Sequence, residues 1–246
     1  MHSITGPYLD SLPNTKKPVV CVLSGGLDST TLLYLLVEKY GAGNVHAITY
    51  FYGQKQALET ELAKQSCAIL GVKHKLIDIS FFGEIVSPVS TNIKGSDIEM
   101  PTIQDVLGDP QPVTYLPFRN TILFSIGFAY AEAAGCEYIF SGLQTQDNYS
   151  YYDATEGFVN KLNSLASLNR QHLIKLVTPF GNISKTEEVE LGIALDVNYE
   201  YTLTCYNPDA WGDSCGTCPS CAERIMAFKN NGAIDPRSYS INIDWS

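Results

Sequence analysis

Near the start of the sequence, a short segment is rich in glycine and hydroxyl side chains. It reads Ser24-Gly25-Gly26-Leu27-Asp28-Ser29-Thr30 and lies between an apolar run and a segment with helical periodicity. Adjacent glycines let the backbone turn sharply and bring its N–H groups close to a ligand. The following helix would add the positive end of its dipole and further free N–H groups, which favour phosphate. We therefore predict a pyrophosphate-binding loop rather than an ordinary turn in which Asp28 only caps a helix.

Four of the seven cysteines lie in one short C-terminal stretch: Cys205, Cys215, Cys218 and Cys221. The last three are spaced Cys-x-x-Cys-x-x-Cys, and four thiolates can close a tetrahedron around Zn²⁺. Such a closed site leaves no open position, so we expect a structural role. An iron–sulfur cluster would use the same four ligands and stays an alternative. The other three cysteines have apolar neighbours and are expected in the core: Cys21, Cys67 and Cys136.

The elements that must position these residues alternate between strand and helix patterns. A continuous apolar, β-branched run predicts a strand at residues 18–23, and the repeating alternation predicts further strands at 45–50, 73–79 and 138–141. Helical periodicity predicts helices at residues 30–39, 57–70, 120–134, 156–168 and 184–195. Ser184 and Glu187 form a capping-box pattern at the last of these. The alternation predicts an α/β fold with a doubly wound, mainly parallel sheet.

The composition of the chain predicts three parts. Residues 1–17 are polar and read as an N-terminal arm with at most one turn of helix. Residues 18–197 carry the predicted sheet, with a long loop or lid at 80–115 that is rich in Pro, Gly, Asp and Ser. Residues 198–246 carry the cysteines and are too short for a core of their own, so we expect a small zinc-binding subdomain.

The charge balance excludes some functions. The 246 residues include 16 Lys and Arg against 26 Asp and Glu, a formal net charge of −10, which opposes wide nucleic-acid binding. No apolar run approaches the length that spans a bilayer, so we expect no membrane partner. The N-terminus lacks the apolar core of a secretory signal, which predicts a cytoplasmic protein with reduced cysteines.

Three segments together resemble a known family: SGGLDSTT, TYLPFRNT and LTCYNPDAWGDSCGTCPSCAER. The chain is similar to the 7-cyano-7-deazaguanine synthase (QueC) family of N-type ATP pyrophosphatases (PP-loop proteins) from about Val19 to Phe228. The resemblance implies an adenine nucleotide alpha hydrolase-like, Rossmann-like fold, ATP, Mg²⁺ and one structural Zn²⁺, and a homodimer. It also implies a ligase of queuosine biosynthesis that forms C–N bonds. Such an enzyme adenylates 7-carboxy-7-deazaguanine and converts it with ammonia, through an amide, to the nitrile preQ0.

The resemblance also assigns roles residue by residue. ATP would contact Ser24, Gly25, Gly26, Leu27, Asp28, Ser29, Thr30, Tyr52, Gly53, Gln54, Arg119 and Asn120. Asp28, Arg119 and Lys185 would be catalytic, with Asp28 capping the loop or helping to hold Mg²⁺. The deazaguanine would be bound by Asp147, Tyr151 and Asp153. From the residues alone, Arg119 and Lys185 would be ordinary surface charges or members of ion pairs.

The chain departs from the family pattern at three places. Phe51 stands where the family has aspartate, Phe118 stands where it has glycine, and the segment 147–155 lacks its Gly, Pro, Cys and Arg. These changes favour keeping a second hypothesis, a paralogue that attaches the deazaguanine to a protein amine in anti-phage defence. A related PP-loop enzyme that modifies tRNA is a third, and the net charge opposes it. A nucleotide-binding zinc module without turnover is the fourth.

Overall fold

The computed structural model describes residues 2–54, 58–89, 93, 115–144 and 151–246. Its centre is a sheet of five strands: β1 (Val19–Val22), β2 (Val45–Phe51), β3 (Lys73–Asp78), β4 (Tyr138–Ser141) and β5 (Lys175–Val177). The strands are ordered β3-β2-β1-β4-β5, and each neighbouring pair is parallel. Val19 of β1 is in register with Val45 on one side and Tyr138 on the other. The predicted parallel sheet is confirmed.

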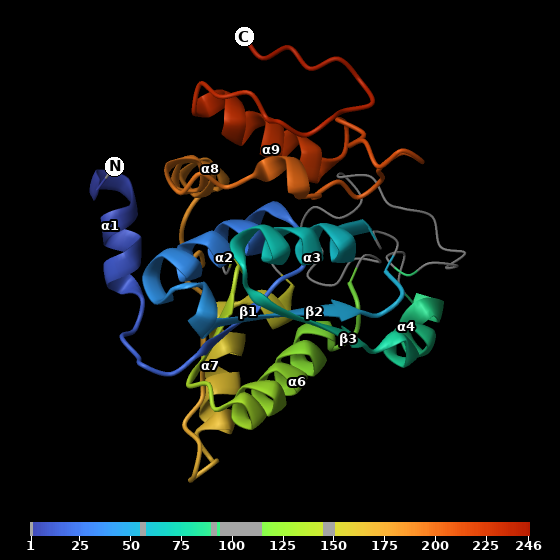
Figure 1. Cartoon of the computed structure of the whole chain (residues 1–246). Coiled ribbons are helices and arrows are strands. Elements are labelled where there is room, and N and C mark those ends of the chain that lie inside the picture. Colours follow the sequence, from blue (N-terminus) through green and yellow to red (C-terminus); the bar gives the residue numbers. More distant parts are fainter. Residues whose placement is uncertain (1, 55–57, 90–92, 94–114, 145–150) are drawn as a thin grey trace.

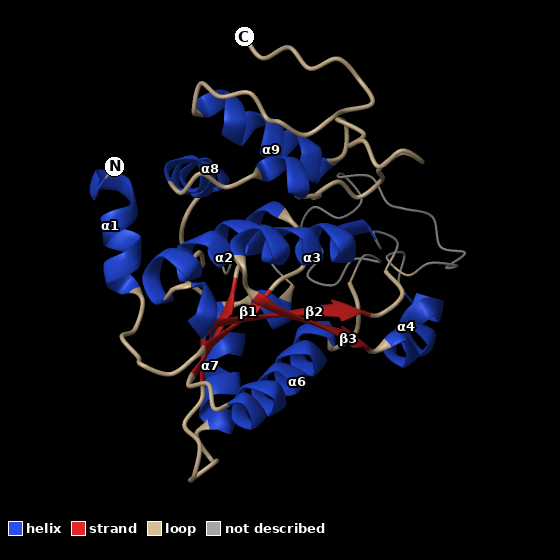
Figure 2. Ribbon diagram, viewed as in Figure 1, coloured by secondary structure: helices blue, strands red, loops and turns tan. Residues whose placement is uncertain are grey.

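Helices cover both faces of this sheet (Figure 1 and Figure 2). On one face lie α2 (Leu27–Tyr40) and α3 (Leu58–Leu70), and on the other lie α6 (Arg119–Ala134) and α7 (Glu156–Ala166). Val19 and Cys21 point into the first core, which lies between the sheet and helices α2 and α3. Val20 between them points into the second core, which lies between the sheet and helices α6 and α7. Because side chains alternate along a strand, a strand covered on both faces must be apolar throughout. This is why β1 is a continuous apolar run.

The C-terminal part adds a further layer outside α2. It contains α8 (Lys185–Ala194) and α9 (Pro219–Asn230), which contact each other, and α8 also contacts α2. Leu27, Val189 and Phe228 share one buried cluster across these three helices. The predicted capping box is present at α8, where the Ser184 hydroxyl accepts from the Glu187 N–H and the Glu187 carboxylate accepts from the Ser184 N–H. Short 3-10 turns complete the described elements: η1 (Ala42–Asn44), η2 (Ser87–Val89), η3 (Tyr152–Ala154) and η4 (Tyr199–Tyr201).

Two expectations for the less regular segments were wrong. The N-terminal arm is a helix, α1 (His2–Ser11), rather than a loose segment with at most one turn. Tyr8 and Leu9 pack against the first core and Leu12 is buried there, so packing outweighs the poor helix propensity of Gly6 and Pro7. The predicted loop at 80–115 begins with a helix, α4 (Ser80–Val86), whose Phe82 and Val86 are buried. Most of the remaining segment lies outside the described residues.

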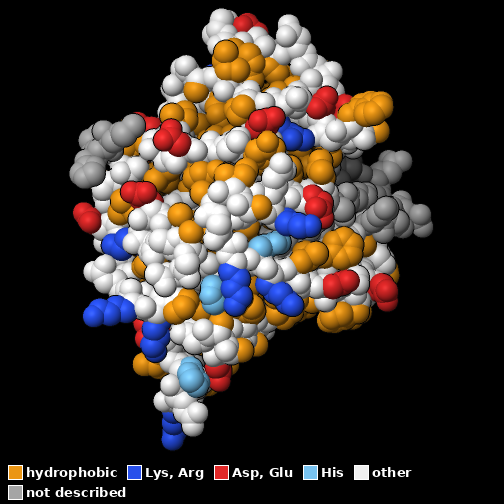
Figure 3. Space-filling model, in the orientation of Figure 1, with side chains coloured by type: hydrophobic (Ala, Val, Ile, Leu, Met, Phe, Trp, Pro, Cys, Tyr) orange, Lys and Arg blue, Asp and Glu red, His pale blue; other side chains and the backbone are white. Residues whose placement is uncertain are grey.

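The other three cysteines lie in the core, as expected. Cys21, Cys67 and Cys136 are buried and free of disulfides. Among the described residues, no helix combines the length and the apolar character needed to cross a membrane. On the face drawn in Figure 3, acidic and basic side chains are interspersed among neutral and apolar ones.

Candidate active site

A pocket of about 390 Å³ opens at the carboxyl ends of β1 and β4. Its lining includes Ser24 and Asp28 after β1, Ser141 and Gly142 at the end of β4, and Arg119 from α6. Strand order reverses here, because the chain runs from β1 outward to β2 and β3 and returns to β4 on the other side. In open parallel sheets, ligands bind at this topological switch point. The predicted glycine loop therefore lies where the fold places a ligand.

The loop is ordered by its own hydroxyl groups. Ser29 Oγ accepts hydrogen bonds from the N–H groups of Ser24 (3.1 Å) and Gly25 (3.3 Å). Ser24 Oγ accepts from the Gly26 N–H at 3.2 Å and lies 3.0 Å from Ser29 Oγ. These N–H and O–H groups converge at the N-terminus of α2, so the loop has the donors that phosphate oxygens accept from.

Gly25 lies between two distant parts of the chain. Its φ is +94°, and a Cβ atom built on it would lie 2.1 Å from the carbonyl oxygen of Glu59 in α3. Its own carbonyl accepts a hydrogen bond from the N–H of Leu203. A side chain here would be strained by the backbone angle and would also collide with α3, so the position requires glycine.

Asp28 and Lys185 form an ion pair beside the loop, and Glu188 extends it. Lys185 Nζ also donates to Glu188 Oε2 at 3.1 Å, one helical turn along α8. Burial lowers the pKa of Lys185, but the negative charges of Asp28 and Glu188 outweigh burial and raise it overall. Burial, followed by the charge of Asp28, raises the pKa of Glu188 well above its ordinary value. Lys185 therefore carries a firmly held positive charge next to the loop.

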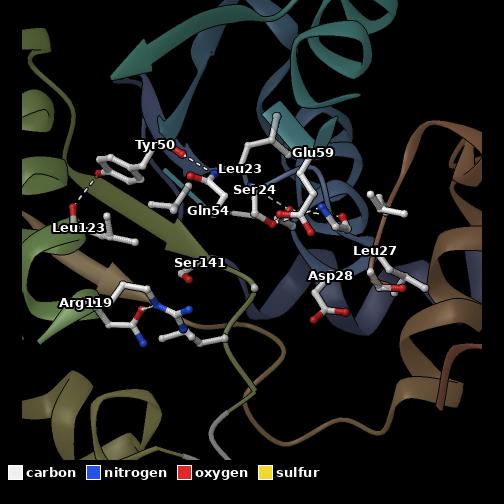
Figure 4. A pocket seen from close by; sticks show the side chains of 18 of the residues that line it. Leu23, Ser24, Leu27, Asp28, Tyr50, Gln54, Glu59, Arg119, Leu123 and Ser141 are labelled. Atoms are coloured by element: carbon white, nitrogen blue, oxygen red, sulfur yellow. Dashed lines mark hydrogen bonds between the residues drawn. The ribbon is translucent and has the colours of Figure 1, made fainter. Parts of the chain in front are cut away.

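Arg119 enters the pocket from the side opposite Ser24 and Asp28 (Figure 4). It is the first residue of α6, and it hydrogen-bonds to the Tyr52 side chain. The preceding residue, Phe118, has φ +54°, the left-handed conformation that side chains rarely adopt. This turn aims α6 so that Arg119 faces the pocket and Phe118 faces outward, 60% exposed.

Glu59 from α3 is a second carboxylate in the pocket, near Ser24 (Figure 4). Burial raises its pKa to about 8, and the positive charge of Arg119 only partly opposes this. At neutral pH the Glu59 carboxyl therefore holds a proton. The pocket then has less negative charge than its residue types imply, which suits an anionic ligand.

The residues after β2 support the pocket wall. Gln54 Oε1 accepts from the Tyr52 N–H at 2.9 Å, and Gln54 Nε2 donates to the Tyr50 carbonyl at 3.1 Å. Gln54 and Tyr52 line the pocket, and Gly53 supports the turn between them with φ +81°. Tyr50 Oη donates to the Leu123 carbonyl at 2.6 Å, which joins β2 to α6 (Figure 4).

The three predicted substrate-binding residues lie in different surroundings. Asp147 lies outside the described residues. Asp153 is buried, and its Oδ2 accepts from the Asn120 N–H at 3.2 Å while its carbonyl accepts from Asn120 Nδ2 at 2.8 Å. Tyr151 packs against Tyr115 with ring centroids 5.8 Å apart. Asp153 therefore anchors the start of α6, and a role in substrate recognition stays a prediction for all three positions.

Not every residue of the predicted nucleotide set borders the pocket. Leu27 and Asn120 line it, whereas Gly25, Gly53 and Thr30 do not, and Thr30 is fully buried behind the loop. Several lining residues were not predicted: Tyr50, Glu59, Ser141, Gly142, Thr204 and Tyr206. For Ser141 and Gly142 a signal existed, since they end a predicted strand next to the loop strand. Nothing in the local pattern marks Glu59 or Glu188.

The four predicted thiolates are brought together. The Sγ atoms of Cys205, Cys215, Cys218 and Cys221 all lie within 4.8 Å of one another. A tetrahedral zinc site with bonds of about 2.3 Å has edges of about 3.8 Å, and Cys215 Sγ lies 3.9 Å from Cys221 Sγ. Backbone N–H groups donate to three of the sulfurs, as Cys215 does to Cys205 Sγ at 3.2 Å. Such donors stabilise thiolate charge, so the cluster could bind zinc.

The fold and this site define a class: a Rossmann-like PP-loop protein with a C-terminal cysteine cluster. The chain belongs to the QueC family, because residues 18–232 match the family model described as Queuosine biosynthesis protein QueC. The family predicted from the sequence motifs is thus confirmed.

Individual relatives agree with this assignment. The chain is 38% identical over 226 residues to a 7-cyano-7-deazaguanine synthase of Caldicellulosiruptor bescii, covering 92% of this chain and 99% of that one. It is 34% identical over 223 residues to the synthase of the same name from Psychromonas ingrahamii, covering 91% and 98%. Among solved structures, the U34-tRNA thiolase NcsA from Methanococcus maripaludis with its 4Fe–4S cluster is similar. Its TM-score is 0.52 at 21% identity, over 92% of this chain and 72% of that one, which shows a shared fold alone.

Proposed function

We propose that this chain is an ATP-dependent 7-cyano-7-deazaguanine synthase. The observation that carries the proposal is the pocket: a glycine loop at the switch point, with Arg119 in the pocket lining and Lys185 in the smaller cavity beside it, in a chain of the QueC family. The names of the relatives give 7-cyano-7-deazaguanine as the product, which favours nitrile formation over transfer to a protein amine or to tRNA; the proposed substrate is 7-carboxy-7-deazaguanine.

The chemistry proceeds in two rounds. A carboxylate oxygen of the substrate attacks the α-phosphorus of ATP, and the bond to pyrophosphate breaks. Ammonia then attacks the acyl carbon, loses a proton and displaces AMP, which leaves the amide. The amide oxygen attacks a second ATP in the same way and displaces pyrophosphate; the nitrogen then loses its two protons and AMP departs, which leaves the nitrile. The proposed nitrogen source is free ammonia.

Each round builds negative charge on the departing pyrophosphate, and the loop is built to hold it. The N–H groups of Gly25 and Gly26 and the hydroxyls of Ser24 and Ser29 are the proposed phosphate donors. Lys185 and Arg119 would neutralise the charge that grows as the bond breaks. Asp28, partly exposed beside the loop, is the proposed Mg²⁺ ligand once Lys185 turns to phosphate.

For the cysteine cluster we propose one structural Zn²⁺. A four-iron cluster places iron and sulfide ions between its thiolates and needs a wider site than sulfurs spaced for a single ion. Bound zinc supplies folding energy to a segment with a small core of its own. A division at residues 17 and 197 into arm, PP-loop domain and zinc subdomain belongs to this proposal, as does a homodimer.

The proposal is tested with purified protein, ATP, Mg²⁺, ammonium and 7-carboxy-7-deazaguanine. We expect mass spectrometry to show the amide and then the nitrile, with AMP and pyrophosphate released. Arg119→Ala should lose most of this activity, whereas Arg170→Ala, which removes an exposed arginine, should keep it. ATP binding without AMP under these conditions would reject the synthase, and a deazaguanine-sized mass gain on a co-expressed protein would favour the paralogue.

A further inference from the structure

Glu188 is a carboxylate with no exposure to solvent. Its side chain is 0% exposed, whereas Asp28, the other anion beside Lys185, is 37% exposed. Glu188 Oε2 accepts from Gln144 Nε2 at 2.9 Å and from Lys185 Nζ at 3.1 Å. Its Oε1 is buried and accepts no hydrogen bond from the residues that the structure describes. Burying a carboxylate costs more than burying an apolar side chain of similar size, so stability alone does not explain this residue.

Glu188 is placed to act on Lys185 rather than on a ligand. It borders neither the main pocket nor a smaller cavity of about 150 Å³ beside it. Lys185 does border the smaller cavity, and Asp28 borders both. The ammonium of Lys185 thus lies between one acidic side chain that a ligand can reach, Asp28, and one that it cannot, Glu188.

We propose that Glu188 is a positioning residue, the permanent anchor of Lys185, while Asp28 is its exchangeable partner. A phosphate group entering the loop replaces Asp28 as the partner of Lys185, and Glu188 keeps the ammonium within reach. The inference rests on the proposed function for the identity of the ligand. Glu188 of α8 would contact no substrate itself, but it would set the position and charge of Lys185, which does.

Several charged groups surround this pair, and each element packed against it contributes. Lys185 faces Asp28 from α2 and Glu223 from α9, and Arg224 of α9 lines the same small cavity. Glu188 acts on Tyr8 of α1 and on Tyr199 of η4. Of these groups, Asp28 and Glu188 do most to raise the pKa of Lys185. Removing the charge of Glu188 should therefore let Lys185 lose its proton at a lower pH.

The test uses Glu188→Gln in the full chain, with Glu190→Gln as the control for one lost charge on an exposed position of the same helix. Calorimetry measures binding of pyrophosphate from neutral to alkaline pH. We expect Glu188→Gln to bind about 10-fold more weakly, as for loss of one charge-assisted contact, with the alkaline decline moved to lower pH. Glu188→Asp, which keeps the charge, should recover part of the affinity. Unchanged affinity and pH dependence in Glu188→Gln would overturn the proposal.

A second variant separates this role from folding. Glu188→Leu removes one partner of a buried pair, so it should unfold at a lower temperature, but its pyrophosphate affinity should be lost even at temperatures where the variant is fully folded. A loss of affinity that only follows a lower melting temperature would also overturn the proposal. If the wild-type protein binds pyrophosphate with the expected pH dependence but makes no nitrile, the proposed function fails and the role of Glu188 stands.

Discussion

The backbone N–H of Leu203 donates a hydrogen bond of 3.0 Å to the carbonyl oxygen of Gly25. Leu203 lies two residues before Cys205, the first thiolate of the cluster, and it is fully buried. The bond therefore joins the segment that holds the cysteines to the loop that borders the pocket. The cysteine cluster and the glycine loop, which lie near opposite ends of the sequence, are thus connected by this contact.

Gly25→Ala should abolish pyrophosphate binding and destabilise the fold by more than about 2 kcal/mol, because strain at positive φ adds to the collision with α3. Gly71→Ala is the matched control, since Gly71 also has positive φ, +67°, but a Cβ there meets nothing within 4 Å. It should cost about 1 kcal/mol. Urea unfolding of both variants checks the difference, and equal losses would show that the close approach of loop and helix carries no energy.

Metal removal should weaken ligand binding through Leu203. Cys218→Ser should lower zinc affinity by more than about 100-fold, since even supporting groups around a metal are worth 10- to 100-fold. We expect elemental analysis to find one zinc per chain in the wild type and little in the variant, together with weaker pyrophosphate binding. Cys136→Ala, which removes a buried thiol outside the cluster, should keep the zinc. Iron in the wild-type protein would contradict the prediction.

Affinity for ATP should fall as the pH rises through about 8, the pKa to which burial raises Glu59. A nearby phosphate favours the protonated carboxyl, so ionisation of Glu59 opposes binding. The folded chain also keeps this proton where the unfolded chain loses it, so stability falls as the pH rises from 4.5 to about 8. Glu59→Gln should flatten both profiles, and Glu61→Gln, exposed on the same helix, should not. Calorimetry and thermal unfolding across this range measure the two effects.

Replacing Phe118 by glycine should destabilise the fold less than replacing it by alanine. Its φ of +54° costs most side chains about 1 kcal/mol relative to glycine, and its ring contacts Tyr152 edge-on at 6.2 Å. Phe118→Ala loses the ring contact and keeps the strain, whereas Phe118→Gly loses both. We expect the glycine variant to be more stable than the alanine variant by about 1 kcal/mol. The opposite order in urea unfolding would mean that the backbone here is not strained.

Sequence patterns predicted the parts of the fold whose cause is local. β1 is a continuous apolar run and β2 and β4 are mainly apolar because both faces are covered, and this pattern identifies them. β5 was missed because it is only three residues long, Lys175–Val177. Its edge is held by Asn163 of α7, whose side chain accepts from the Leu176 N–H and donates to the Leu176 carbonyl. That partner is visible only in three dimensions.

In the candidate site, too, some residues are marked by a local sequence pattern and others only by their surroundings in the folded chain. The thiolates could be predicted because sulfur ligands at short spacing have few other uses, and the loop because its glycines adjoin a strand. Glu59 and Glu188 look like ordinary helix acids in the sequence. Their properties come from burial against other elements, which no local pattern encodes. α1 was missed for a related reason, since its helix depends on packing against the first core.

The contact between Gly25 and Leu203 also sets an order of events during synthesis. The glycine loop leaves the ribosome early, but its partner follows only after about 10 to 35 seconds at ordinary translation rates. Until then the loop carbonyl lacks its bond and the wall formed by Leu203 and Thr204 does not exist. The glycine loop is the first part of the pocket to be synthesised, but the pocket is complete only after Leu203 and Thr204 have followed. A nascent or truncated chain should therefore not bind nucleotide before its cysteines have emerged.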